Sequence, residues 1–299
     1  MDRRRLKRRL FFWRGFAVLA VLAAVLVALR GERVGFEGAR VERVVVSGII
    51  TQDRKLTDAI DKLADNANIK AVIVSVDSPG GSVAGGEALH NAIVRVAAKK
   101  PVVAVMGGVA ASAGYMISVP AARIFASEAT LTGSIGVLLE TGDISGLLGK
   151  LGINSEPIVS GPLKDQPSYT RPLSPEGRQV LQGLVMDMYD QFVTMVARGR
   201  HMDPDKVRTL ADGRPYTGRQ ALNLGLVDQI GGERAARDWL AKEKGVPSSL
   251  PTEDLTTGGL TSRVLSSSLS WIIDSLWKTV LSQGVKLDGA QALWQRSGD

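Results

Sequence analysis

The stretch Val105-Met-Gly-Gly-Val-Ala-Ala-Ser112-Ala-Gly-Tyr-Met116 determines how the rest of the chain is organised. The apolar run Pro101–Met106 is typical of a buried strand, and Ala111–Val119 is predicted to be the following helix. Ser112 then lies at a helix N-terminus, where developing negative charge is favoured and free N–H groups can donate to an oxyanion. Ser112 is therefore a candidate nucleophile. The alternative is that it only caps the helix.

Two further buried strands are predicted before this one, at Val44–Ile50 and Ala71–Val76. A helix is predicted after each, the first one capped by Thr51. Strand and helix in strict alternation favour an α/β fold with a parallel sheet and right-handed crossovers. Functional loops of such sheets lie at the carboxyl ends of the strands. The glycine-rich loop Asp77-Ser-Pro-Gly-Gly-Ser82 is therefore expected beside Ser112.

Beyond Ser112 the pattern continues less regularly. Strands are predicted at Ile124–Ala126, Leu131–Leu139 and Glu156–Ser160, and a short helix at Ile144–Leu151. A polar loop, 161–172, precedes a long helix that Ser174-Pro-Glu176 opens with a cap, a proline and an acid. Its apolar stripe is interpreted as core packing and consists of Leu181, Leu184, Val185, Met188, Phe192, Met195 and Val196. Shorter helices follow from Asp203 and from Gly218.

Composition narrows the classes of function. The chain has 299 residues, of which 44% are hydrophobic, and this is ample for a folded core. It contains no cysteine, which excludes disulfides, thiolate metal sites and a cysteine nucleophile. The net charge is +7, but much of the excess lies in the first nine residues. Nucleic-acid binding is not indicated, because interleaved aromatic residues are missing elsewhere.

The two ends of the chain differ from the middle. Basic residues precede the apolar run Phe16–Leu29, which predicts a cytoplasmic segment and transmembrane anchor over residues 1–30, with the remainder outside the cytoplasm. A cleaved signal peptide is the alternative. Residues 31–40 are predicted to be a tether and 41–245 the main domain. Residues 246–299 are expected to form a linker and an amphipathic helical tail that lies on the membrane or packs on a partner.

A serine hydroxyl needs a base before it attacks an amide. His90 and His201 are the two histidines, and neither has a motif around it. A lysine can act instead if desolvation lowers its pKa from about 10.4 to near neutrality. Lys164 follows a predicted strand and a Gly-Pro turn, and it is the candidate lysine, although most lysines are solvated.

Five separated motifs, in order, resemble one known family. They are Asp77–Ser82, Met106–Tyr115, Leu131–Val137, Ser160–Asp165, and Gly213–Ala221 with Gly225–Asp228. Together they resemble the S49 family of membrane-anchored serine peptidases, which includes signal peptide peptidases, over roughly residues 41–240.

The resemblance implies roles for particular residues. Ser112 is the implied nucleophile and Lys164 the implied general base, and neither a metal nor a cofactor is needed. The implied oxyanion hole consists of backbone amides near Gly80, Gly81 and Ala113, and the Ser134 hydroxyl is placed to orient the lysine amine. The implied fold is the ClpP/crotonase-like one, a parallel sheet of ββα units.

Two departures from the family pattern matter. Ala113 stands where many members have glycine, and the chain carries one copy of a domain that some members have twice. For single-copy members the implied assembly is a homo-oligomeric ring in which one subunit's lysine serves the neighbour's serine. The implied substrates are hydrophobic peptides, chiefly residual signal peptides, at the extracytoplasmic side of the bacterial cytoplasmic membrane.

Three other functions stay open at this point. A crotonase-like acyl-CoA enzyme would share the fold and the glycine-rich oxyanion loops. A related membrane peptidase acting on stomatin-like proteins would keep the serine and the lysine and change only the substrate. A non-catalytic membrane scaffold would keep the fold and the anchor alone.

Overall fold

A computed structural model of the chain describes Trp13 and residues 38–256, nearly all of them in the compact unit Glu37–Leu255. The predicted transmembrane anchor, most of the tether and the amphipathic tail lie outside the described residues. Among the residues that are described, none of the helices has the length and apolar character needed to cross a bilayer.

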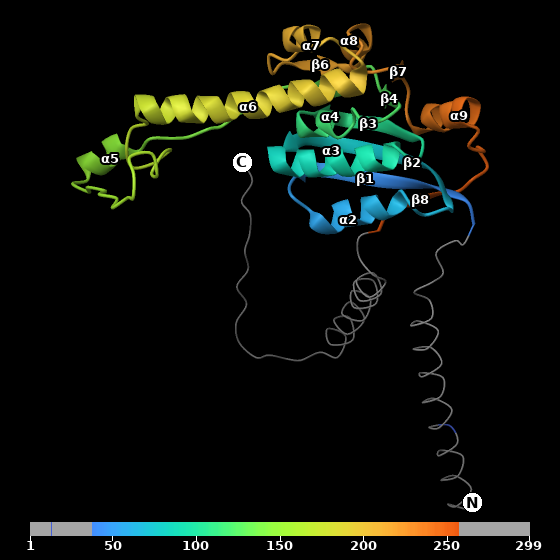
Figure 1. Cartoon of the computed structure of the whole chain (residues 1–299), viewed down its shortest axis with the longest axis horizontal. Helices are drawn as coiled ribbons and strands as arrows, with labels where there is room; N and C mark the ends of the chain where they lie inside the picture. The colour runs from blue at the N-terminus through green and yellow to red at the C-terminus, as the bar shows by residue number, and fades with distance from the viewer. Residues whose placement is uncertain (1–12, 14–37, 257–299) are drawn as a thin grey trace, which may run out of the picture. The chain divides into compact units, whose positions relative to one another are not determined.

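The centre of the compact unit is an eight-stranded sheet (Figure 1). Its main order is β6-β5-β3-β2-β1-β8, with β4 paired to β3 and β7 to β4. All pairs are parallel except β5 with β6. The mostly parallel α/β sheet expected from the sequence is thereby confirmed. The strands are β1 (Arg40–Ile50), β2 (Ile69–Gly81), β3 (Val102–Ala111), β4 (Arg123–Ala126), β5 (Leu131–Gly133), β6 (Pro215–Thr217), β7 (Gln229–Ile230) and β8 (Thr252–Asp254).

Helices cover both faces of this sheet. The described helices are α2 (Arg54–Leu63), α3 (Val83–Ala97), α4 (Ala113–Met116), α5 (Ser145–Lys150), α6 (Pro175–Arg200), α7 (Pro204–Leu210), α8 (Gly218–Asn223) and α9 (Glu233–Lys244). Alternate strand residues such as Val44, Val74 and Ala104 pack with α2, α3, α4 and α6 in the larger core. A smaller core on the other face joins Ile73 and Phe125 to α9.

Two strands run past their predicted ends and bring the glycine-rich segments together. Asp77–Gly81 is the end of β2, not a loop, and Gly80 and Gly81 pair with Ile49 and Ile50 of β1. β3 likewise continues through its glycines to Ala111, so the helix expected over Ala111–Val119 shrinks to the four residues of α4. Pro120 follows closely, and a proline disfavours helical geometry in the residue before it.

Other local expectations were wrong for identifiable reasons. The strand predicted at Leu131–Leu139 ends at Gly133, because Gly133 and Ser134 both have positive φ, at 73° and 46°. The segment Glu156–Ser160 is not a strand, and its Ile158 is fully exposed. Asp53 caps α2 in place of Thr51, by accepting the N–H of Leu56.

Helix α6 has two unlike halves. Ser174 caps it as predicted, and the carboxyl-terminal half buries Phe192, Val193, Val196 and Ala197 in the core. The amino-terminal half projects away from the sheet and bears α5 and its loops at its far end (Figure 1). Leu184 is therefore about half exposed, and the predicted core stripe holds only for the second half. We call residues 138–186 the arm.

The compact unit also extends further toward the carboxyl end than expected. Residues 246–255 were predicted to begin a linker, but Val246 is buried and β8 pairs with Val41–Arg43 of β1. Arg43 holds this edge, because its guanidinium contacts Asp254 at 2.5 Å and Glu233 at 2.8 Å. The unit therefore ends at Leu255, and the predicted end at residue 245 falls short.

Candidate active site

Ser112 lies directly after β3 in an unusual backbone conformation. Its φ is 53° and its ψ is −120°, a geometry that persists in a non-glycine residue only where the surroundings enforce it. Its N–H donates to Gly133 O at 2.9 Å. Ser82 and Ser174 cap their helices through the side chain, whereas the Ser112 side chain makes no capping hydrogen bond. Its hydroxyl therefore does not serve as a helix cap.

The end of β2 lies against this serine. A Cβ added at Gly80 would lie 2.8 Å from Ser112 Cβ and 3.2 Å from its Oγ, so only glycine fits there. The Gly80 N–H donates to Ser78 Oγ at 3.1 Å. Gly81 instead faces β1, because its Cβ would lie 1.9 Å from the carbonyl oxygen of Ile50. Of the two glycines expected near an oxyanion hole, Gly80 is thus the one beside Ser112.

Ala113 is the first residue of α4, so its N–H has no acceptor within the helix. Its side chain packs tightly against α3, since a Cβ on Gly86 would lie 2.9 Å from it. This packing fixes the position of the Ala113 backbone. The start of α4 can therefore present an N–H toward charge that develops at Ser112.

A pocket of about 690 Å³ opens in front of Ser112. Its walls consist of Pro79, Ser112, Ser134, Gly136, Val137, Leu138, Gln182, Val185, Met186, Tyr189, Ala211, Asp212 and Gly213. Ser134 therefore shares the pocket with Ser112. Its Oγ donates to Gly213 O at 3.1 Å, which leaves the oxygen lone pairs available to accept from an amine.

Lys164 does not line this pocket. It is exposed in the arm, in a turn where its N–H donates to Gly161 O at 3.1 Å. The loop packs near the beginning of α6, where Gln166 contacts Gly177. Gln182 is the first residue of α6 that lines the pocket, and it lies five residues further along, about 7.5 Å at the helical rise of 1.5 Å per residue. The described residues therefore do not supply the apolar surroundings expected for the amine.

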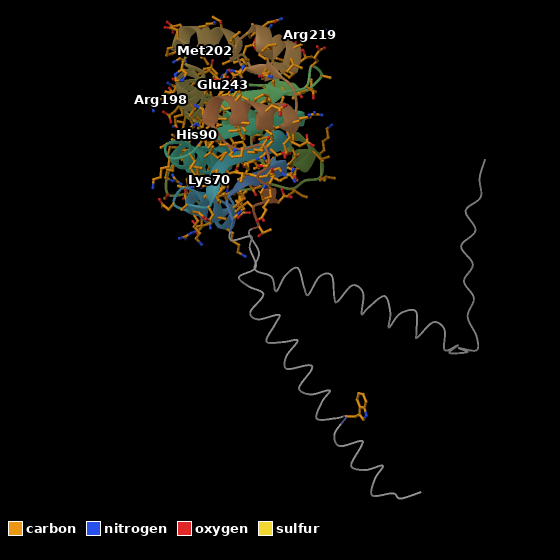
Figure 2. The ribbon with its side chains drawn as sticks, turned by 90° about the vertical axis from the view of Figure 1, so that its right-hand side faces the viewer. Lys70, His90, Arg198, Met202, Arg219 and Glu243 are labelled. Atoms are coloured by element: carbon orange, nitrogen blue, oxygen red, sulfur yellow. The ribbon has the colours of Figure 1, made fainter. Side chains whose placement is uncertain are left out.

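Neither histidine lines the pocket either. His90, which is labelled in Figure 2, lies on α3, and its Nδ1 is 3.2 Å from Asn91 Oδ1. Burial lowers the pKa of His90 below 6.5. His201 is the left-handed residue that ends α6, with φ of 52°. A histidine triad with Ser112 is therefore not formed in this chain, and the described residues include no cluster of metal-ligating side chains.

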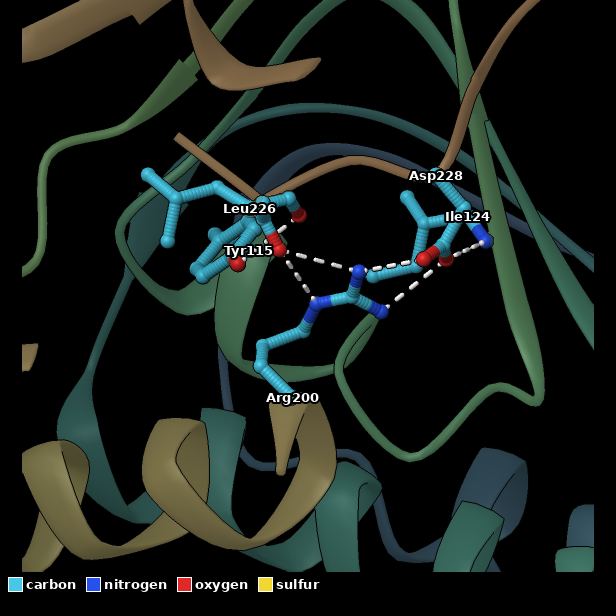
Figure 3. A network of polar contacts seen from close by, with 6 residues as sticks. Tyr115, Ile124, Arg200, Leu226 and Asp228 are labelled. Atoms are coloured by element: carbon cyan, nitrogen blue, oxygen red, sulfur yellow. Dashed lines mark hydrogen bonds and ion pairs between the residues drawn. The ribbon is translucent and has the colours of Figure 1, made fainter. Parts of the chain in front are cut away.

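A buried polar network supports the site from behind, and the sequence analysis did not assign it a role (Figure 3). The Tyr115 hydroxyl donates to Leu226 O at 2.9 Å. Arg200, at the end of α6, bonds Gly225 O and both carboxylate oxygens of Asp228, which in turn accepts the N–H of Ile124. Burial raises the pKa of Tyr115. The network ties α6 and α4 to one loop, so the pocket wall is held relative to Ser112.

Comparisons with known proteins identify the family to which this chain is similar. The sequence profile described as Peptidase family S49 matches residues 95–247, and the profile described as Clp protease matches residues 39–130. The second match covers β1 to β4 and supports the ClpP-like α/β fold. A ClpP1 variant from Listeria monocytogenes is similar in structure, with a TM-score of 0.43 and 17% identity over 64% of this chain and 92% of that chain.

Three relatives illustrate the sequence similarity. A putative protease from Synechocystis sp. is 40% identical over 208 residues, which are 69% of this chain and 75% of the relative. A putative signal peptide peptidase SppA from Enterococcus faecium is 43% identical over 188 residues, 62% of this chain and 54% of the relative. Protease 4 from Salmonella typhi is 42% identical over 164 residues, 54% of this chain and 26% of the relative.

Proposed function

Because this chain belongs to peptidase family S49 and is a serine peptidase, we propose that Ser112 is its nucleophile and that Lys164 of a neighbouring copy is the general base. The proposal rests on one observation, namely that Ser112 and Lys164 lie in different parts of the chain. Ser112 has a pocket and enforced geometry but no lysine or histidine at the pocket wall. Lys164 is exposed on an arm whose apolar surface is left uncovered by the residues that the structure describes.

The proposed reaction is acyl transfer to serine followed by hydrolysis. The neutral Lys164 amine takes the Oγ proton as Ser112 attacks the peptide carbonyl, and returns it to the leaving amine. The same amine then deprotonates a water, which releases the acyl group. Packing of the arm against a neighbour would remove the amine from water, and burial in an apolar environment disfavours a charged group. The Ser134 hydroxyl, by accepting from the amine, would orient it.

Charge on the tetrahedral intermediate is proposed to be held by backbone N–H groups. Ala113 supplies one of them, at the start of α4. Gly80 supplies the other, and the oxyanion then competes with Ser78 Oγ, to which this N–H donates at 3.1 Å. Gly81 contributes by fixing the end of β2 against Ile50.

The pocket also indicates the class of substrate. Val185, Met186 and Tyr189 of α6 form an apolar wall, which favours hydrophobic peptide side chains. One relative is named a putative signal peptide peptidase. We therefore propose residual signal peptides as substrates, cut by a homo-oligomeric ring that residues 1–30 anchor to the cytoplasmic membrane with the catalytic domain outside. Deletion of residues 1–30 should then move the enzyme from the membrane fraction to the soluble fraction.

Labelling with a fluorophosphonate tests the nucleophile. The full chain should be modified at Ser112, and Ser112→Ala should lose both labelling and peptide hydrolysis, the latter by roughly 10⁴-fold or more. Ser127→Ala is the matched control, because Ser127 is exposed and does not line the pocket. Labelling at another serine, or turnover by Ser112→Ala, would contradict the assignment.

A further inference from the structure

The pairing of β2 with β3 contains an irregularity just before the nucleophile. The strands pair residue by residue from Val72 with Val102 to Val76 with Met106, and pairing resumes at Ser78 with Ala110. One residue of β2, Asp77, therefore faces three residues of β3, Gly107–Val109. We call these three residues the bulge. Because the two extra residues are an even number, the alternation of faces is kept while β3 is redirected.

The Asp77 side chain fills this bulge. Its Oδ1 accepts the N–H of Val109 at 3.0 Å, a bond that the irregular pairing would otherwise leave unmade. A Cβ on Gly107 would lie 3.0 Å from both Cβ and Cγ of Asp77, so the carboxylate lies directly over the glycine. On the other edge of β3, the buried Thr130 hydroxyl donates to Gly107 O at 2.8 Å. The bulge is thus held from both sides by side chains.

Both strands reach the active site three residues beyond this point. On β3, Ser112 follows Val109 by three residues, and on β2, Gly80 follows Asp77 by three. The two ends converge, because Gly80 lies within contact distance of Ser112. After the bulge, β3 also exchanges its neighbour β4 for β5, whose Gly133 O accepts the Ser112 N–H. A change in the bulge would therefore alter where Ser112 Oγ lies relative to the Gly80 backbone.

We propose that Asp77 is a positioning residue for the reaction at Ser112. It acts through the bulge, by holding the Val109 N–H and covering Gly107, and it does not touch the substrate. The feature that matters is the acceptor oxygen and not the negative charge. The inference rests on the proposed role of Ser112 as nucleophile.

The test compares Asp77→Ala with Asp77→Asn in the full chain, by peptide hydrolysis and by the rate of fluorophosphonate labelling. Asp77→Ala should lower kcat by about 10-fold to 100-fold with KM changed less than about twofold, since a small misplacement costs up to about 10²-fold. Labelling of Ser112 should slow in parallel. The side chain introduced by Asp77→Asn has the same length and keeps an acceptor oxygen, so this variant should retain most of the wild-type kcat.

Asp53→Ala is the matched control. Asp53 is also an exposed carboxylate that accepts a backbone N–H, from Leu56 at 3.0 Å, but it caps α2. This variant should lower the thermal midpoint slightly and leave kcat unchanged. If Asp77→Ala does not fold, Gly107→Ala carries the same test, because the added methyl displaces the Asp77 side chain while its carboxylate is retained.

Three results would overturn the inference. They are an unchanged kcat in Asp77→Ala or Gly107→Ala, equal losses in Asp77→Ala and Asp77→Asn, and a loss of kcat in Asp53→Ala as large as in Asp77→Ala. Failure of the proposed function would look different. In that case the wild-type chain itself would not be labelled at Ser112.

Discussion

The two halves of α6 carry similar apolar residues in very different surroundings. In the second half, Phe192 and Val196 are 1% and 0% exposed, whereas in the first half Leu184 and Met186 are 49% and 44% exposed. The same contrast separates the sheet, which is packed on both faces, from the rest of the arm, where Ile158 is fully exposed. Clustered exposed apolar side chains mark interaction surfaces. Within the described residues, the scaffold around Ser112 is thus fully packed, whereas the segment that holds Lys164 has an apolar surface that none of them covers.

Two alanine substitutions in α6 should have different effects on stability, according to the half of the helix in which they lie. Phe192→Ala should lower the free energy of unfolding by about 3–5 kcal/mol, because it opens a cavity in a packed core. Leu184→Ala should change it by less than about 0.5 kcal/mol in the dissociated chain, and should weaken self-association instead. Urea unfolding and sedimentation measure the two effects. Equal losses of stability from both variants would mean that the arm packs within its own chain.

A second pair of substitutions tests which contacts hold the buried half of α6 in place. Arg200→Ala leaves Asp228 without its ion pair, in which Arg200 is only 8% exposed, and should lower the free energy of unfolding by roughly 3 kcal/mol. Arg208→Ala is the control, because its pair with Asp190 is 45% and 52% exposed and should be worth less than about 1 kcal/mol. Calorimetry compares them. If the two variants lose the same stability, the network does not anchor α6.

The smallest expected effect is a change of stability with pH, and it arises from the buried His90. Burial lowers the pKa of His90 in the folded chain, so the unfolded chain binds this proton first as pH falls below 6.5. Stability should therefore be fully present above pH 6.5 and decline below it, and His90→Gln should lack this part of the decline. Urea unfolding of both proteins at about pH 5.5 and pH 7.5 measures the difference. Parallel pH slopes would show that His90 is not the group responsible.

The sequence was sufficient for the parts of the fold that repeat a local pattern. The strands around Val44–Ile50, Ala71–Val76 and Pro101–Met106 are apolar runs that are short and rich in valine and isoleucine, and these two properties together identify them as strands. Ser112 was proposed as a candidate nucleophile because small residues surround it where a strand ends. The strand ends themselves were misjudged, because pairing with β1 and the bulge opposite Asp77 depend on neighbours distant in the sequence.

The arm shows a second limit of prediction from sequence. An apolar stripe at helical spacing predicts a buried face but does not say whether the same chain or another buries it. Leu184 and Phe192 are indistinguishable by this criterion. The Arg200–Asp228 pair was missed because ion pairs between residues 28 apart leave no local signal. The motif at Gly225–Asp228 was noticed, but its role as the partner of Arg200 and Tyr115 emerged only from the structure.

The central claim is that each active site combines the core of one chain with the arm of the next. Co-expression of Ser112→Ala and Lys164→Ala chains tests it most directly. Each variant alone should be inactive. If chains mix at random in a head-to-tail ring, about a quarter of the interfaces combine an intact serine with an intact lysine, so about a quarter of wild-type activity should return. Mixed assemblies that remain as inactive as the separate variants would contradict the claim.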